Sequence, residues 1–160
     1  MLTSRRIVGI AAVASALLVL HVLPALAQSK DPLVGNWKLD VDKSTFPAAP
    51  PMRRSMTFTA VSGGLKQAIT TTTNADITYE LVYTAKFDGK DYPADVASAF
   101  NTIEMKRLDP RTVERIGKVK GTVVETETYS VSRDGRTLSV KQEGENNGVP
   151  FKTAQVFERQ

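Results

Sequence analysis

The pattern that decides the fold lies in Ile77-Thr-Tyr-Glu-Leu-Val-Tyr-Thr-Ala-Lys-Phe-Asp88. Every second residue from Ile77 to Phe87 is apolar or aromatic, whereas the residues between them are mostly polar or charged. Because successive side chains of a strand point to opposite faces, this alternation predicts a β-strand with one face buried and the other in water. The fold then depends on what kind of sheet the neighbouring segments make.

The same alternation recurs along the chain between short turns rich in Gly, Pro, Asn and Asp. We expect strands at about 33–41, 54–61, 65–72, 77–87, 101–108, 112–117, 122–132 and 151–159, and one more that presents Leu138 and Val140 before a turn at 145–148. Tight turns such as Ser62-Gly63-Gly64 and Asp134-Gly135 join neighbouring strands, and no segment has the pattern of a crossover helix. The prediction is an all-β fold: a single antiparallel up-and-down meander of about 8–10 strands. An open sandwich is the alternative, but closure into a barrel removes exposed strand edges, so we favour the barrel.

The N-terminal segment has the features of an export signal. Arg5 and Arg6 precede an apolar run that Pro24 ends, and Ala25-Leu-Ala27 is the small-x-small pattern that a signal peptidase cleaves. We therefore expect residues 1–27 to be a cleaved signal peptide and residues 28–160 to form one domain. An uncleaved N-terminal anchor is the alternative. Cleavage after Ala27 predicts a periplasmic or secreted protein that is not inserted in a membrane.

The residue types that are missing exclude several function classes. The chain has no Cys, and its one His, His21, lies in the expected signal peptide. Thiol nucleophiles, thiolate metal sites and a Ser-His-Asp triad are therefore excluded, and we expect no metal, no cofactor and no catalytic residue of those kinds. Residues 28–160 hold 19 basic and 17 acidic side chains that do not cluster by sign, so nucleic acid is not an expected partner.

Three segments carry a resemblance to a known group. They are Gly35-Asn-Trp-Lys-Leu39, Tyr83-Thr-Ala-Lys-Phe-Asp-Gly-Lys-Asp-Tyr-Pro93 and Ser132-Arg-Asp-Gly-Arg-Thr-Leu138. Together they resemble a group of uncharacterised bacterial exported proteins with a lipocalin-like, calycin-type barrel, and the likeness covers most of residues 28–160. The resemblance implies a β-barrel with an internal cavity and small-molecule binding by analogy. The chain lacks the disulfide and the long C-terminal helix of secreted animal lipocalins.

In a barrel of this kind, Gly35 and Trp37 have a structural role. We expect the Trp37 indole to close one end of the core, with an arginine from a late strand stacked on it. Arg159 or Arg115 would supply that guanidinium. Gly35 and Trp37 are therefore predicted to be the plug of the barrel.

The candidate ligand-binding residues share the inward face of the predicted strands. The aromatic stripe of the opening segment either fills the interior or lines an apolar pocket, and both readings stay open. Inward charged residues such as Arg107, Arg115, Glu125 and Glu127 would form an internal network, hold a ligand carboxylate, or lie at a wet rim. The candidate ligand-binding set is Phe58, Tyr79, Leu81, Tyr83, Phe87, Met105, Arg107, Arg115 and Tyr129.

Three function classes follow from these residues. The favoured one is an exported carrier that holds a small apolar or amphipathic molecule inside the barrel, with Arg107 or Arg115 orienting its polar end and the 91–99 connection, including one helical turn at 95–99, as a lid. The second is a barrel-type enzyme of isomerase or cyclase kind that uses Tyr and Glu. The third is a filled barrel that acts through its surface in the cell envelope. The oligomeric state is left open.

Overall fold

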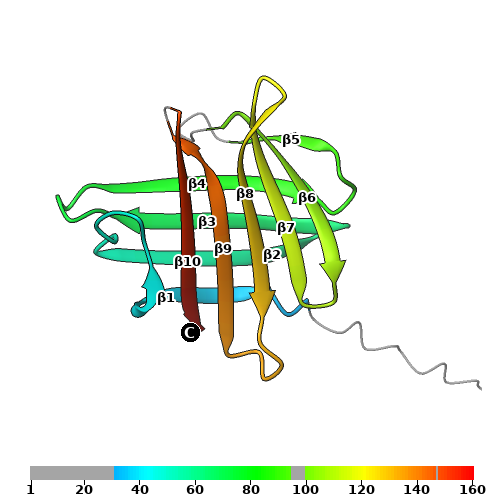
Figure 1. Cartoon of the computed structure of the whole chain (residues 1–160). Coiled ribbons are helices and arrows are strands. Elements are labelled where there is room, and N and C mark those ends of the chain that lie inside the picture. Colours follow the sequence, from blue (N-terminus) through cyan, green and yellow to red (C-terminus); the bar gives the residue numbers. More distant parts are fainter. Residues whose placement is uncertain (1–30, 95–99, 147) are drawn as a thin grey trace, which may run out of the picture.

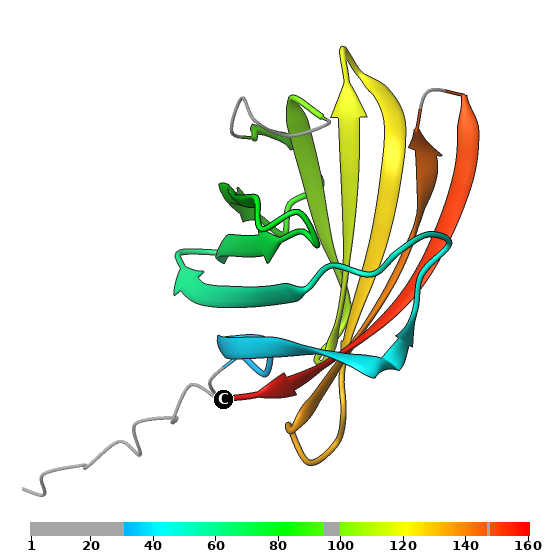
Figure 2. The ribbon, with the colours of Figure 1, turned by 90° about the vertical axis from the view of Figure 1, so that its left-hand side faces the viewer.

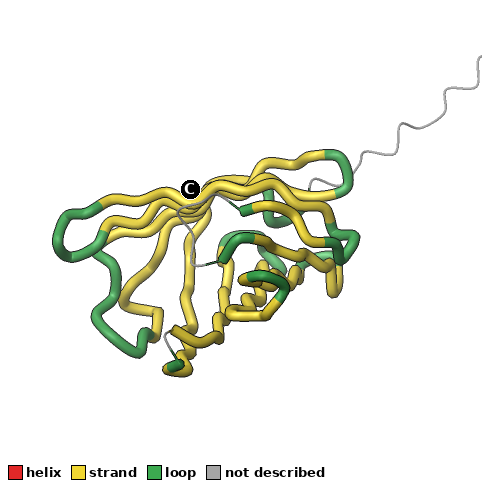
Figure 3. The backbone as a smooth tube through the Cα atoms, turned by 90° about the horizontal axis from the view of Figure 1, so that it is seen from above, coloured by secondary structure: helices red, strands yellow, loops and turns green. Residues whose placement is uncertain are grey.

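The alternating sequence folds into ten strands in the computed structural model, which describes residues 31–94, 100–146 and 148–160. Their bounds are β1 (Gly35–Thr45), β2 (Arg53–Val61), β3 (Gly64–Thr72), β4 (Thr78–Lys86), β5 (Asp91–Pro93), β6 (Thr102–Asp109), β7 (Thr112–Val119), β8 (Thr122–Val131), β9 (Thr137–Asn146) and β10 (Val149–Arg159). In the described part of the chain Figure 3 shows strands, turns and loops only. No helix among those residues is long and apolar enough to span a membrane.

The strands form one antiparallel sheet that nearly closes on itself. Its order is β4-β3-β2-β1-β10-β9-β8-β7-β6-β5, so the first and last long strands pair with each other. A bridge between Tyr83 and Ala94 then links β4 to the residue after β5. In Figures 1 and 2, β1–β4 cross β6–β10 at a steep angle, and the two groups of strands face each other. The predicted all-β meander barrel is confirmed, with ten strands.

Two elements differ from the sequence prediction. Strand β1 continues to Thr45 instead of ending near Val41, although its register with β10 is irregular between Asp40 and Thr45. There the Ser44 hydroxyl donates to the Asp40 carbonyl (2.6 Å) and accepts from the Val156 N–H (3.0 Å). A side chain thus replaces ladder hydrogen bonds, and side-chain alternation cannot reveal such a substitution.

Strand β5 is the second difference, because the sequence suggested only a connection there. It has three residues, Asp91–Pro93, and pairs with β6 from Asp91↔Glu104 to Pro93↔Thr102. A strand this short shows no alternation, so its existence depends on the partner strand. The helical turn expected at 95–99 lies outside the described residues.

One end of the barrel is closed by Trp37. The indole is 0% exposed, and its Nε1–H donates to the Leu33 carbonyl (2.8 Å). The Arg159 guanidinium lies over the ring, 4.1 Å from Cζ to the ring centroid. Gly35 has φ +139°, and a Cβ there would lie 2.5 Å from Arg159 Nη1. Glycine is required at this position because of both its backbone angle and the close approach of the arginine.

Candidate ligand-binding site

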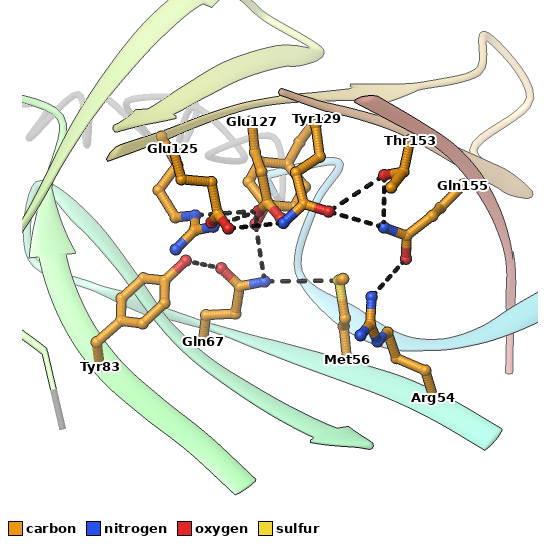
Figure 4. Close-up of polar contacts among 11 residues, drawn as sticks. Arg54, Met56, Gln67, Tyr83, Glu125, Glu127, Tyr129, Thr153 and Gln155 are labelled. Atoms are coloured by element: carbon orange, nitrogen blue, oxygen red, sulfur yellow. Dashed lines mark hydrogen bonds and ion pairs between the residues drawn. The ribbon is translucent and has the colours of Figure 1, made fainter. Parts of the chain in front are cut away.

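Polar side chains from both groups of strands meet inside the barrel. Alternation places Glu125, Glu127 and Tyr129 of β8 on one inward face, and the neighbouring strands add Arg115 from β7 and Gln155 from β10. Figure 4 shows the β8 side chains and Gln155 opposite Arg54, Gln67 and Tyr83, which come from β2, β3 and β4. The interior is therefore partly polar, and every charge in it needs a partner.

The deep half of this network is centred on Arg115, which is 1% exposed. Its Nε donates to Glu127 Oε2 (3.0 Å), and its Nη2 forms ion pairs with Glu127 (2.9 Å) and with Glu125. The ring of Phe100 covers the guanidinium, with Cζ 4.7 Å from the ring centroid. Burial alone lowers the pKa of Arg115, but the carboxylates of Glu127 and Glu125 outweigh burial and raise it above its ordinary value. When ionised, the two carboxylates leave the trio with one excess negative charge.

Two tyrosines and a glutamine complete the deep half. Tyr129 donates its hydroxyl proton to Glu127, Gln67 Nε2 donates to the Tyr129 oxygen (3.3 Å), and Tyr83 donates to Gln67 Oε1. Phe58 packs edge-on against Tyr129, with ring centroids 5.7 Å apart. Burial raises the pKa of both tyrosines well above the ordinary value, so their hydroxyls stay neutral donors.

The outer half of the network runs towards Arg54. Gln142 Nε2 donates to Glu125 Oε2 (2.8 Å), and Gln155 Nε2 donates to Gln142 Oε1 (3.3 Å). Arg54 then donates from Nη1 to Gln155 Oε1 (2.8 Å) and from Nε to the Thr71 hydroxyl (3.1 Å). No ion pair joins Arg54 to an acidic residue within the described part of the chain. Its charge is therefore available.

A pocket of about 450 Å³ opens at this outer end. It lies between the β1–β2 connection, which Figure 2 shows as a long cyan segment, and the β3–β4 turn. Its lining combines apolar residues of the β1–β2 connection with polar residues of the strands, and Arg54 is one of the polar residues. The lining consists of Phe46, Ala49, Pro50, Pro51, Arg54, Thr71, Thr73, Asn74, Ala75, Tyr79, Gln142, Thr153 and Gln155. The volume is in the range of small-molecule sites.

The structure separates the residues that the sequence suggested for ligand binding. Phe58, Tyr83, Met105, Arg115 and Tyr129 are buried in the core and its network. Leu81 is partly buried against that core. Tyr79, which is 50% exposed, is the one member of the predicted set that lines the 450 Å³ pocket.

Neither arginine suggested for the polar end of a ligand presents a free charge to this pocket. Arg115 is paired with two carboxylates, as described above. Arg107 pairs with Asp31, and its Cζ lies 4.2 Å from the centroid of the Phe87 ring. Arg107 thus pairs with the N-terminal segment and stacks on Phe87. The arginine that does line the pocket is Arg54.

Arg54 itself was missed, although the sequence held a signal for it. It precedes Met56 and Phe58 by two and four residues, so strand alternation places all three on the same face. A charged residue at the start of a predicted strand is read as solvent-exposed unless its partners are known. Those partners, Thr71 and Gln155, come from β3 and β10.

No metal centre is visible in residues 31–94, 100–146 and 148–160. Within them, no group of three or more His, Cys, Asp or Glu side chains is placed to hold a metal ion.

The comparisons with known proteins point to the fold. No protein-family model matches the chain, and no curated protein sequence does either. Among solved structures it is similar to As-p18, an extracellular fatty acid binding protein, with a TM-score of 0.55 and 18% identity over 81% of this chain and 97% of that one. The fold is a lipocalin-like barrel. The tryptamine complex of the amine binding protein of Rhodnius prolixus also matches, with a TM-score of 0.46 and 14% identity over 82% of this chain and 65% of that one.

Proposed function

We propose that the protein is an exported carrier that binds a small amphipathic molecule with one anionic group in the pocket at the open end of the barrel. The observation that carries the proposal is Arg54, a half-buried guanidinium in the lining of a 450 Å³ pocket that has no carboxylate partner in the described part of the chain. Thr71 and Gln155 hold two of its donors and leave the others for a ligand.

The pocket matches both ends of such a molecule. An anionic group would accept charge-assisted hydrogen bonds from Arg54, which are stronger than neutral ones. Phe46, Pro50 and Tyr79 would pack against the apolar body. As-p18, one of the structures similar to this chain, is named a fatty acid binding protein, and a fatty acid is an amphipathic anion of this class.

The geometry also bears on the alternative of an acid–base enzyme. Glu127 and Tyr129 are buried in contact with each other, which is the kind of pair such an enzyme would use. Neither residue lines the 450 Å³ pocket, so a molecule held there would not touch them. The carrier is therefore the function that the pocket supports best.

Two probes of matched shape test the proposal. Anilinonaphthalene sulfonate carries a permanent anion, and phenylnaphthylamine has the same aromatic body without it. We expect Arg54→Gln to weaken sulfonate binding about tenfold or more in a fluorescence titration, the size of a lost charge-assisted hydrogen bond, and to leave the neutral probe unaffected.

The matched control is Arg53→Gln, which removes the same charge from the adjacent exposed position. It should leave both affinities unchanged. Equal effects of the two substitutions would mean that net charge alone attracts the sulfonate, and the proposed site would be wrong.

Export is tested separately from binding. Expression of residues 1–160 in a bacterium with two membranes should deliver a periplasmic protein whose N-terminal sequence starts at Gln28. A product that keeps residues 1–27 and sediments with membranes would identify an anchor instead.

A further inference from the structure

A one-way chain of hydrogen bonds leads from the pocket to a buried carboxylate. It starts at Arg54 Nη1, which donates to Gln155 Oε1 (2.8 Å). Gln155 Nε2 donates to Gln142 Oε1 (3.3 Å), and Gln142 Nε2 donates to Glu125 Oε2 (2.8 Å). Figure 4 shows the dashed lines that leave Arg54 for Gln155 and continue towards Glu125. We call these four residues the relay.

The two ends of the relay fix its direction. A guanidinium has only donors, and an ionised carboxylate has only acceptors. Each amide between them must therefore turn its oxygen towards Arg54 and its NH₂ towards Glu125. The orientation of Gln155, which holds Arg54, thus depends on the charge state of a residue that does not line the pocket.

We propose that Glu125 is a positioning residue for ligand binding, which acts through Gln142 and Gln155 to hold Arg54 in the orientation that receives an anion. This inference rests on the proposed function, since it concerns the same pocket. With Nε held by Thr71 and one Nη1 donor held by Gln155, Arg54 enters binding already ordered. Ordering a side chain before the ligand arrives lowers the entropic cost of binding.

A neutral Glu125 would reverse the relay. Arg115 donates to one Glu125 oxygen and can only donate, so an added proton must sit on the other oxygen, which faces Gln142. Gln142 would then turn its oxygen to that proton and its NH₂ towards Gln155 and towards the Thr153 hydroxyl, which bridges the two amides (3.1 Å to Gln142 and 3.0 Å from Gln155). Gln155 would turn in response, and its NH₂ would meet the donors of Arg54. Glu125→Gln has the same effect, because its NH₂ must avoid Arg115.

The surroundings of Glu125 raise its pKa, so a pH titration can test this reversal. Burial raises its pKa, while Arg115 on β7 lowers it and Glu127 on β8 raises it further, for a net upward shift. Tyr83 on β4 stays neutral. On the outer side, Glu145 and the ion pair of Glu143 with Lys152 line a recess shared with Glu125. Glu125 therefore gains its proton at a higher pH than an ordinary glutamate.

The charge of Glu125 and its role in the relay predict opposite effects of Glu125→Gln on the affinity for the sulfonate. An ionised Glu125 repels an anion, so its charge alone predicts that Glu125→Gln tightens sulfonate binding. The relay predicts weaker binding, by about two- to tenfold, the equivalent of one hydrogen bond. The relay also predicts that wild-type affinity falls as pH drops through the raised pKa of Glu125, although the sulfonate stays ionised, and that Glu125→Gln shows no such step.

The experiment is a fluorescence titration of full-length variants with anilinonaphthalene sulfonate from mildly acidic to mildly alkaline pH. Gln142→Met breaks the relay without a change of charge and should weaken sulfonate binding like Glu125→Gln. Because Gln142 also lines the pocket, phenylnaphthylamine reports any direct effect of the substitution, and its affinity should stay unchanged. Glu143→Gln removes an equal charge from the same recess, and the Glu143 side chain pairs with Lys152 and not with the relay, so this variant should not weaken binding. If Glu125→Gln lowers the thermal midpoint below the assay range, Gln142→Met decides.

The outcomes separate this inference from the proposed function. Weaker binding in both relay variants, with the pH step lost in Glu125→Gln, supports the positioning role. Unchanged or tighter binding in both, while Arg54→Gln still weakens binding, overturns the relay and leaves the ligand site intact. No effect of Arg54→Gln overturns the site and the relay together.

Discussion

Each end of the barrel holds an arginine, and the two side chains are used in different ways. At the closed end, Arg159 stacks on Trp37 and donates to three backbone carbonyls, those of Gly135 (2.6 Å), Val34 (2.8 Å) and Pro32 (2.5 Å). At the open end, Arg54 has no aromatic partner in the described residues and donates to one amide and one hydroxyl. The same residue type completes the fold at one end and leaves donors available at the other.

The difference shows how a structural arginine can be told from a binding one. A backbone carbonyl cannot turn unless the chain itself moves, so a side chain that satisfies one becomes part of the fold. Side-chain amides and hydroxyls can turn, so Arg54 can exchange them for a ligand. Substitutions at the closed end should therefore change stability, and substitutions at the open end should change affinity.

The largest effect is expected for Trp37→Ala. Removal of a fully buried indole leaves a cavity beside Arg159, and the free energy of unfolding should fall by about 3–5 kcal/mol. Urea denaturation followed by circular dichroism measures it. Trp37→Phe, which keeps a ring under the guanidinium, should lose clearly less. A small loss for Trp37→Ala would mean that this end is not the structural one.

The arginines themselves give the next comparison. Arg159→Met should lower the free energy of unfolding by about 2–3 kcal/mol, because carbonyls inside the closed end lose their donors. Arg54→Met should cost less than about 1 kcal/mol, because its partners can turn to one another or to water. Both values come from the same denaturation curves. Equal losses would remove the distinction between the two ends.

Gly35→Ala should have an intermediate effect, about 1–3 kcal/mol, from strain at φ +139° and from contact with Arg159 Nη1. Gly121→Ala is the control, because Gly121 also has positive φ (+83°) but nothing lies within 4 Å of an added Cβ. The amount by which Gly35→Ala lowers the free energy of unfolding more than Gly121→Ala does measures the contact with Arg159. If Gly35→Ala and Gly121→Ala lose the same free energy of unfolding, measured by thermal and by urea denaturation, the whole effect comes from backbone strain.

The smallest stability effect is expected for Tyr79→Ala, within about 0.5 kcal/mol, because the ring is 50% exposed. It should weaken the sulfonate and the neutral probe alike, by about two- to threefold, since it removes an apolar wall and no charge. Ile77→Ala, on the same hairpin but outside the pocket lining, should leave both affinities unchanged. A loss specific to the sulfonate would assign Tyr79 a polar role.

The sequence was informative about strands and faces, and less so about which inward residues meet. Alternation correctly placed Phe58, Met105 and Tyr129 in the interior, because parity along a strand is a local property. It could not distinguish Arg115, buried between two carboxylates, from Arg107, which pairs with Asp31. Both follow an apolar residue by two positions, and only the neighbouring strands separate them.

The sequence by itself determined an all-β meander with its turns, its inward faces and the absence of thiol and imidazole chemistry from residues 28–160. Only the tertiary structure decided which arginine lines the pocket with no carboxylate partner among the described residues, namely Arg54. Arg54 of β2 reaches Gln155 of β10 because β1 and β10, the first and last strands of the chain, pair with each other and bring β2 close to β10. Pairing and burial of a charge depend on such contacts between distant parts of the chain, so the candidate site is a property of the folded sheet.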